Sequence, residues 1–169
     1  MIEIVGAQGK VSDIENFLEK VDKYSKKNDV LIQVFDADMV FGKNHLVSAY
    51  NHAKRAFENG TNTTKSIEME LLLYASGERQ LKLAIPKMGV KKGNVNIALV
   101  FIDSTDKRID NKINEFVLES LLKKNDKVLE GSLNTLEKFG LDGSEIKTVA
   151  KDKYEDLILE KVAMVDIIK

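Results

Sequence analysis

The run NVNIALVFID, from Asn94 to Asp103, constrains the fold more than any other stretch of the sequence. It is almost continuously apolar and rich in β-branched residues, which is typical of a strand buried in a sheet. Two shorter runs of the same character come earlier, at Ile2–Ala7 and at Asp29–Ala37. Segments with helical spacing separate the three runs, and this order predicts an α/β fold.

Helix-start and helix-stop residues support this interpretation. Ser12 is followed three residues later by Glu15, which predicts a capping box at the start of the first helix. The sequence pattern predicts further helices at about 43–59, 63–76, 78–88, 109–123, 126–139 and 154–168. No linker of domain-splitting length and no internal repeat interrupts the chain, so residues 1–169 are expected to form one domain.

Composition limits the classes of function. The formal net charge is -1, so no global basic field attracts nucleic acid, and any RNA site must be a local patch. The chain has no cysteine, which excludes disulfides, thiol catalysis and zinc–thiolate sites. No apolar run is long enough to cross a membrane, and the N-terminus lacks the order of a signal peptide. We therefore expect a cytoplasmic protein without a membrane partner.

The helix predicted at 43–59 carries a ladder of small residues. Ala49, Ala53 and Ala56 share one face, so another helix can approach closely, either within the core or from a partner. His45 and His52 lie seven residues apart, a rise of roughly 10 Å, which is too far for one metal ion. We expect no metal site, a buried or capping role for His45, and a place at a helix border for His52.

The next helix, in TTKSIEMELLLYAS, is apolar nearly all round and should be central. Glu70 falls among its apolar residues, where an unpaired carboxylate would be very costly. Arg79 is one candidate partner and His45 is another. A Glu70–Arg79 pair would brace two helices, whereas an outward Arg79 could hold an anion, since its fork matches carboxylate and phosphate alike.

The pair Ser76-Gly77 fits a tight turn between two helices. Gly77 can adopt a positive φ at no steric cost, and Ser76 can cap the helix that follows. The pair is therefore interpreted as a structural motif.

Two stretches of this region, HLVSAYNHAKRAF and TNTTKSIEMELLLYASGERQLKLAIPKMGV, resemble a known family. They are similar to the small kinase-binding subunit of the KEOPS (EKC) complex, the PRPK-binding protein family, in its archaeal form. The resemblance follows the order of elements over the whole chain and is sharpest from His45 to Val90. The features that carry it are Ala49, Ala53, Ala56, Glu70, the segment from Ser76 to Gln80, Ala84 and the segment from Met88 to Val90.

The resemblance implies a non-catalytic subunit without a cofactor or a small-molecule substrate. Such a subunit binds the kinase-like ATPase of a complex that places a threonylcarbamoyl group on adenosine in tRNA (t6A). It is also implicated in holding tRNA by its 3′ acceptor (CCA) end. The implied fold is α/β, a small mixed or antiparallel sheet flanked by about six to eight helices.

Two sets of residues are candidates for contacts with these partners. Side chains near the central block could follow an RNA backbone: Lys54, Arg55, Lys65, Arg79, Gln80, Lys82 and Lys87. The last helix has more apolar surface than one buried stripe requires, so it lies either in the core or partly against a protein partner. Its apolar residues at helical spacing are Leu157, Ile158, Val162 and Val165.

Three classes of function remain open. The first is the complex subunit that the resemblance implies. The second is a stand-alone RNA-binding module, which would bind tRNA as tightly without the ATPase. The third is an enzyme that uses His45 or His52 with Glu70. The first is favoured, because the sequence shows no nucleophile–base pair, metal cluster or phosphate-binding loop.

Overall fold

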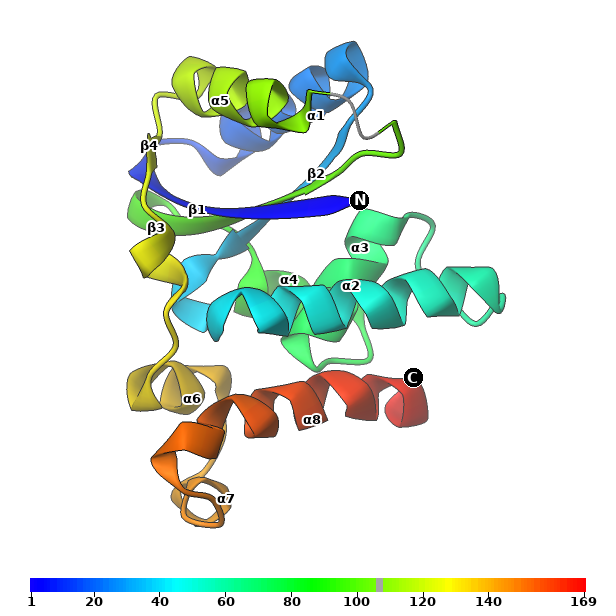
Figure 1. Ribbon diagram of the computed structural model, residues 1–169, viewed down its shortest axis with the longest axis vertical. Coiled ribbons are helices and arrows are strands. Elements are labelled where there is room, and N and C mark those ends of the chain that lie inside the picture. The colour runs from blue at the N-terminus through cyan, green and yellow to red at the C-terminus, as the bar shows by residue number, and fades with distance from the viewer. Residues whose placement is uncertain (106–107) are drawn as a thin grey trace. The chain divides into compact units, whose positions relative to one another are not determined.

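Eight α-helices and a four-stranded antiparallel sheet make up the computed structural model, which describes residues 1–105 and 108–169 (Figure 1). Within those residues the elements are β1 (Ile2–Val11), α1 (Ile14–Asn28), β2 (Leu31–Asp36), α2 (Gly42–Glu58), α3 (Ile67–Ser76), α4 (Leu81–Met88), β3 (Gly93–Ile102), α5 (Ile109–Glu119), β4 (Lys123–Lys124), α6 (Leu133–Phe139), α7 (Gly143–Ile146) and α8 (Tyr154–Ile168). The predicted α/β class with a small sheet is confirmed. No helix in the described ranges is long and apolar enough to span a membrane.

The backbone contacts divide the chain into two compact units. The sheet unit consists of Met1–Ala37 and Val90–Val128, and it holds β1 to β4, α1 and α5. The helical unit consists of Asp38–Gly89 and Leu129–Lys169, and it holds the other helices. The expectation of one domain over residues 1–169 stays a prediction.

The strand β3 lies inside the sheet, whose order is β2-β3-β1-β4. Its segment Ile97–Phe101 is completely buried, as the apolar run in the sequence predicted. The strand β1 pairs with β3 from Ile2 opposite Ile102 to Val11 opposite Gly93. This pairing carries β1 four residues beyond the predicted end at Ala7, because the polar residues after Ala7 pair with the start of β3.

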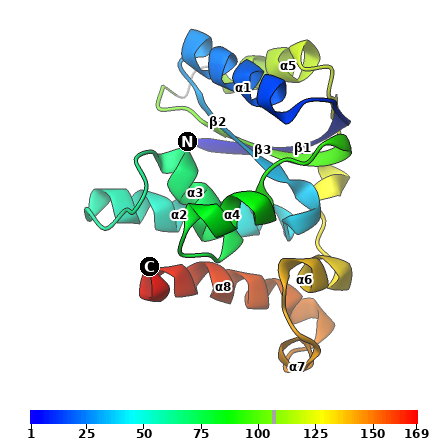
Figure 2. The same cartoon turned by 180° about the vertical axis from the view of Figure 1, so that it is seen from behind.

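The helices α1 and α5 lie side by side on one face of the sheet (Figure 2). Their apolar residues form one core with the strands, and the ring of Phe116 stands at its centre. It makes edge-to-face contacts with Tyr24 of α1, at 5.2 Å between ring centroids, and with Phe101 of β3, at 5.9 Å. This core fixes α1 and α5 relative to the sheet.

The start of α1 differs from the sequence-based expectation. Asp13, not Ser12, is the N-cap residue, and its carboxylate accepts a hydrogen bond from the backbone N–H of Asn16 at 3.1 Å. The predicted capping box of Ser12 and Glu15 is therefore wrong. Aspartate and serine are almost equal as N-caps, so the local sequence alone does not separate the two positions.

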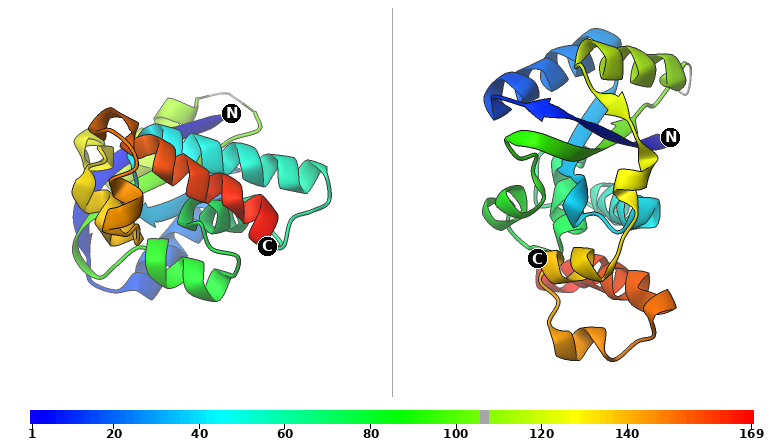
Figure 3. Two further views of the ribbon diagram at one scale, coloured as in Figure 1. Left: turned by 90° about the horizontal axis from the view of Figure 1, so that it is seen from below. Right: turned by 90° about the vertical axis from the view of Figure 1, so that its left-hand side faces the viewer.

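In the helical unit α2 packs against both α3 and α8, and Figure 3 shows α2 and α8 running side by side. Gly77 ends α3 with φ of 69°, as expected. Ser76 does not cap α4, whose N-cap is Gln80. Instead the Ser76 hydroxyl donates to the carbonyl oxygen of Leu73 and accepts from the N–H of Glu78.

Four predicted helices are shorter than expected, and the one predicted at 78–88 begins at Leu81. The helix predicted at 63–76 begins at Ile67, and the one predicted at 109–123 ends at Glu119. Leu121 adopts a left-handed φ of 57°, which stops that helix and lets Lys123–Lys124 pair with β1. The helix predicted at 126–139 becomes a 3₁₀ turn followed by α6, which begins after the N-cap Ser132.

Candidate functional site

A fully buried carboxylate, that of Glu70, lies at the base of the candidate site in the helical unit. Its oxygens accept hydrogen bonds from the backbone N–H groups of Thr63 and Thr64 and from the Thr64 hydroxyl at 2.7 Å. The ammonium group of Lys169, itself almost buried, donates to Glu70 at 2.6 Å. The charge is therefore paired and hydrogen-bonded, as a buried carboxylate requires.

The expected pairing of Glu70 with Arg79 or His45 is not present. Arg79 is exposed, and the two nitrogens of His45 bind backbone groups. Side chains on a helix lean toward its N-terminus, so the carboxylate of Glu70 reaches Thr63 and Thr64 before α3 rather than Arg79 beyond its end. Burial raises the pKa of Glu70, but the hydrogen bonds from Lys169 and Thr64 outweigh it and leave the pKa lowered.

A second hydrogen-bonded group joins α2, α3 and α8. The hydroxyl of Tyr74 donates to one carboxylate oxygen of Asp166 at 2.5 Å, and Nδ1 of His52 lies 2.7 Å from the other. The guanidinium of Arg55 lies 2.8 Å from the same Nδ1 and 3.8 Å from Asp166. Guanidinium and carboxylate cannot both be satisfied by one ring nitrogen. We assign the Nδ1 proton to the bond with Asp166, and Arg55 then pairs with that carboxylate through charge.

The hydrogen bonds of this group set the protonation states of Asp166 and Tyr74. Burial acts to raise the pKa of Asp166, but the hydrogen bonds from Tyr74 and His52 outweigh it and lower that pKa. Burial, with the hydrogen bond to Asp166, raises the pKa of Tyr74. The imidazole of His52 also stacks on the Tyr74 ring at 5.4 Å between centroids. Asp166 is therefore ionised, and Tyr74 stays neutral.

A cavity of about 450 Å³ opens over these two groups. Its lining residues, apart from Ala56, carry charged, hydroxyl or amide groups: Arg55, Asn59, Thr61, Thr63, Asp166 and Lys169. We call it the Arg55 cavity. Both cations face a carboxylate, Lys169 that of Glu70 and Arg55 that of Asp166. The cavity therefore offers mainly hydrogen-bonding groups, together with the partly exposed guanidinium of Arg55, whose fork can bind a phosphate.

The structure places the predicted RNA-binding residues at several separate positions. Arg55 is the one that lines the Arg55 cavity. Lys54 is exposed and pairs loosely with Glu58 on its own helix, at 3.9 Å. The other exposed members lie before, between or within α3 and α4: Lys65, Arg79, Gln80 and Lys82. Their assignment to RNA stays a prediction.

Lys87 differs from the other basic residues. Its ammonium group lies 3.4 Å from Glu78 and 3.8 Å from the centre of the Phe139 ring. Burial lowers its pKa, although the charge of Glu78 opposes that effect. The side chain is thus held within the helical unit by a salt bridge and a cation–π contact.

The predicted partner-binding residues of α8 lie inside the protein. Leu157, Ile158, Val162 and Val165 are all buried, which favours the core packing that the sequence left open. Their role in partner binding stays a prediction. The same helix exposes a different apolar set near its end: Met164, Ile167 and Ile168.

His45 is fully buried, and both of its ring nitrogens form hydrogen bonds with backbone groups. Its Nδ1 accepts the N–H of Phe41 at 3.1 Å, so its Nε2 carries the proton and donates to the carbonyl of Ala75 at 2.8 Å. Burial lowers its pKa to about 4, although the bond to Ala75 acts the other way. His45 is neutral at physiological pH and has no free ring nitrogen for proton transfer.

The described parts of the chain contain no group of three or more His, Asp or Glu side chains that could hold a metal ion. Sequence reasoning missed Lys169 and Asp166, because they reach Glu70 and Tyr74 from the end of α8, 99 and 92 residues away along the chain. It also missed Thr63 and Thr64. The signal that could have found them is a pair of threonines just before a helix whose first turn holds an isolated glutamate.

Comparison with known proteins adds two findings. Residues 10–166 match the family model described as kinase binding protein CGI-121. The chain is also 32% identical over 137 residues to a protein of Methanocaldococcus jannaschii named regulatory protein Cgi121. That alignment covers 81% of this chain and 84% of the relative.

Proposed function

Since the chain belongs to the CGI-121 family of kinase-binding proteins, we propose that it is a regulatory subunit of the KEOPS complex. In this role it binds the kinase-like ATPase of the complex and helps to present tRNA for t6A formation. The observation that carries the proposal is the family match over residues 10–166. It includes the α2–α4 region and the last helix as far as Asp166, and these supply most of the candidate site.

The exposed apolar end of α8 supports a protein contact. Ile167 is 75% exposed, and Met164 and Ile168 are also exposed. The other face of the helix already packs in the core, so these three apolar side chains are not required for folding. We assign this surface, Met164, Ile167 and Ile168, to the kinase-like partner. The buried residues of α8 then act indirectly, because they hold the helix in place.

The Arg55 cavity supports the contact with tRNA. It combines the guanidinium of Arg55 with the threonine and asparagine groups that hydrogen-bond to sugars and bases, and the lining residues Lys169 and Asp166 are held in place by Glu70 and Tyr74. An acceptor end is single-stranded, so its phosphates and base edges are free to enter such a cavity. We assign the 3′ CCA end to it.

A non-catalytic role is consistent with the geometry. The carboxylate of Glu70 is saturated by donors from Thr63, Thr64 and Lys169, and His45 is saturated by the backbone. A general base needs a free lone pair within hydrogen-bond reach of a substrate. The alternative of an enzyme using His45 or His52 with Glu70 is therefore disfavoured, since both versions need Glu70.

Binding of tRNA with the CCA end intact or trimmed tests the proposal. The intact tRNA should bind more tightly, and Arg55→Gln should remove that difference, because the guanidinium contributes the exposed charge of the cavity. The matched control is Lys147→Gln, which removes a charge from an exposed position of the helical unit that is not among the candidates for RNA contact. Equal binding of intact and trimmed tRNA by the native protein would contradict the acceptor-end assignment.

The contact with the ATPase is tested separately by co-purification. The kinase-like ATPase should be retained by the native protein with or without tRNA. If the native protein binds tRNA but does not retain the ATPase, the second candidate, a stand-alone RNA-binding module, would be favoured.

A further inference from the structure

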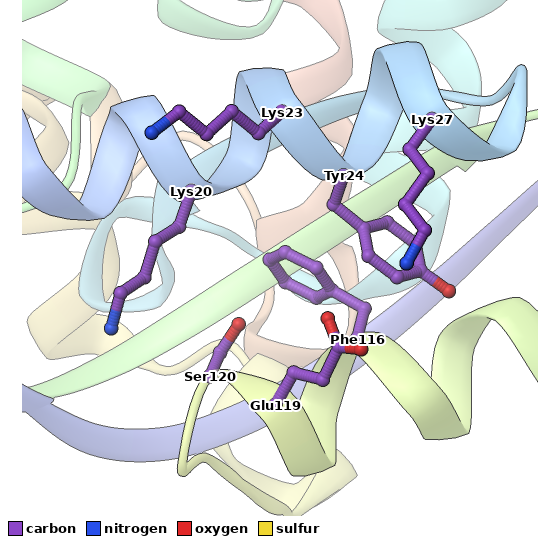
Figure 4. A pocket seen from close by; sticks show the side chains of 7 residues that line it. All are labelled: Lys20, Lys23, Tyr24, Lys27, Phe116, Glu119 and Ser120. Carbon is purple, nitrogen blue, oxygen red and sulfur yellow. The ribbon is translucent and has the colours of Figure 1, made fainter.

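A groove lies between α1 and α5 of the sheet unit, and Figure 4 shows it from close by. Lys20, Lys23 and Lys27 of α1 line one side of it. Glu119, at the end of α5, and Ser120 line the other. The groove has a volume of about 270 Å³. We call it the α1–α5 groove.

The three lysines form one stripe. They follow the i, i+3, i+7 spacing of one helix face and span about 10 Å along its axis. None of their ammonium groups takes part in an ion pair within residues 1–105 and 108–169, whereas Lys26 on the same helix binds Asp22 at 2.7 Å. One wall of the groove therefore presents three positive charges that the chain does not neutralise.

The floor of the groove is rigid and apolar. The rings of Tyr24 and Phe116 meet edge to face, and the Tyr24 hydroxyl donates to the carbonyl oxygen of Lys112 at 2.8 Å. Both rings are buried, so no base can stack on their faces. The volume is below the range of roughly 300–1,000 Å³ that small-molecule sites occupy. The site thus suits a segment of a polymer that crosses it.

The opposite wall selects the chemistry of that polymer. Burial, followed by the charges of Glu115 and Glu119, raises the pKa of Tyr24 to about 12. The carboxylate of Glu119 lines the groove beside Tyr24. That carboxylate repels the anionic groups of any polymer, so the polymer must offer neutral hydrogen-bond donors on this side. An RNA strand carries phosphates for the lysines and 2′-hydroxyl groups, which can donate to Glu119 and bind Ser120.

We propose that the α1–α5 groove binds the sugar–phosphate backbone of an RNA strand. Two or three successive phosphates lie along Lys20, Lys23 and Lys27, and the ribose hydroxyls face Glu119 and Ser120. This is an RNA contact of the sheet unit and does not use the Arg55 cavity of the helical unit. It rests on the proposed function only in taking tRNA as the RNA concerned.

The test uses the full chain with all three lysines of the stripe changed to glutamine and tRNA trimmed of its CCA end. Binding is followed by fluorescence anisotropy over a salt series. The affinity should fall on the order of tenfold, and the slope of log affinity against log salt should fall by about 2. The matched control changes Lys10, Lys147 and Lys153 to glutamine. It has the same net charge and should bind within about twofold of the native protein.

A second variant, Glu119→Gln, keeps an acceptor in the groove and removes a negative charge beside the phosphates, so it should bind the trimmed tRNA more tightly. Equal weakening by the groove and control variants would overturn the proposal, because net charge alone would then explain binding. Failure of the native protein to bind trimmed tRNA, or weaker binding by Glu119→Gln, would also overturn it.

Competition identifies the polymer. When the two polymers are compared by their concentration of negative charges, polyuridylate should displace the trimmed tRNA from the native protein at a lower concentration than polyglutamate does. The reverse order would assign the groove to an acidic protein and overturn the RNA proposal. Because this RNA lacks the CCA end, the result is independent of the Arg55→Gln experiment. A failure here is therefore distinguishable from a failure of the acceptor-end assignment.

Discussion

The ion pair of Lys169 with Glu70 is the single interaction on which the candidate site depends most. Lys169 keeps only 6% of its side chain exposed and Glu70 none, so each neutralises a charge that water does not reach. The ammonium group also lies 4.5 Å from the centre of the Tyr74 ring, which belongs to the neighbouring hydrogen-bonded group. Glu70 and Asp166 are thus linked through the side chains of α3 and α8.

Replacement of Lys169 should therefore be costly. Lys169→Met leaves the carboxylate of Glu70 buried without its counter-ion, and we expect a loss of about 3 kcal/mol in the free energy of unfolding, measured by urea titration. The double variant with Glu70→Gln should recover most of this loss, because no buried charge remains. The control Lys153→Met removes an exposed lysine and should be nearly neutral. A Lys169→Met protein as stable as the native one would show that the pair contributes little.

His45 predicts a pH dependence of stability. Unfolded protein protonates this histidine near pH 6.5, whereas folded protein does so only near pH 4. Stability is therefore complete above pH 6.5 and is lost as the pH falls from 6.5 toward 4, by roughly 3 kcal/mol at most.

Unfolding in urea at a series of pH values measures this effect. The variant His45→Gln, although less stable at neutral pH, should lose much less stability between pH 6.5 and 4.5 than the native protein does. Losses below that range belong to carboxylates, whose usual pKa values are lower. Parallel curves for the two proteins would show that His45 is not the titrating group.

At the scale of elements, α8 has two different apolar surfaces, which the sequence pattern does not separate. Its buried stripe packs within the helical unit beside α2 and α3, and its exposed end carries Met164, Ile167 and Ile168. Ile158 and Val162 are completely buried, so a glutamate at either position should unfold the isolated protein. The surface of the helix is therefore tested at Ile167.

Ile167→Glu should leave the protein folded and abolish its co-purification with the kinase-like ATPase. Ile167 is 75% exposed, so the free chain tolerates a charge there, whereas an apolar interface excludes it. Leu118→Glu is the matched control, since Leu118 is 76% exposed and lies on α5 in the sheet unit. Undiminished binding by Ile167→Glu would remove this end of α8 from the interface.

The turn between α3 and α4 depends on its glycine. Gly77 has φ of 69°, and a Cβ atom there would lie 3.4 Å from Cβ of Lys161 on α8. Gly77→Ala should lower the free energy of unfolding by about 1–2 kcal/mol through backbone strain alone. Gly143→Ala, at a position with open space and no left-handed φ, should have no such cost. Equal melting temperatures for the two variants would contradict this account.

At the scale of the whole molecule, the two units carry different candidate surfaces. The helical unit holds the Arg55 cavity and the exposed end of α8, and the sheet unit holds the α1–α5 groove. A net charge of -1 gives no general attraction for RNA, so affinity must come from these local groups.

A protein with only local RNA contacts should bind tRNA weakly alone and more tightly with its partner. Addition of the kinase-like ATPase should lower the Kd for intact tRNA by on the order of tenfold or more, because linked sites raise the effective concentration of each other. Titration of labelled tRNA with and without the ATPase measures this. An unchanged Kd would favour the stand-alone RNA-binding module.

The sequence by itself determined the features that depend on neighbours along the chain. The apolar run at residues 94–103 predicted the buried strand β3, the all-round apolar pattern before Gly77 predicted a buried helix, and Gly77 predicted the turn. The lack of cysteine excluded thiol and disulfide chemistry. These predictions succeed because burial periodicity and backbone sterics are local properties.

Only the tertiary structure decided which distant groups meet. It gave Glu70 the counter-ion Lys169 instead of Arg79, brought Asp166 to Tyr74, and extended β1 along β3. It also separated the buried stripe of α8 from its exposed end. A buried charge needs a partner, but the identity of that partner depends on helix packing and side-chain direction. Neither is determined by the residues next to the charge in the sequence.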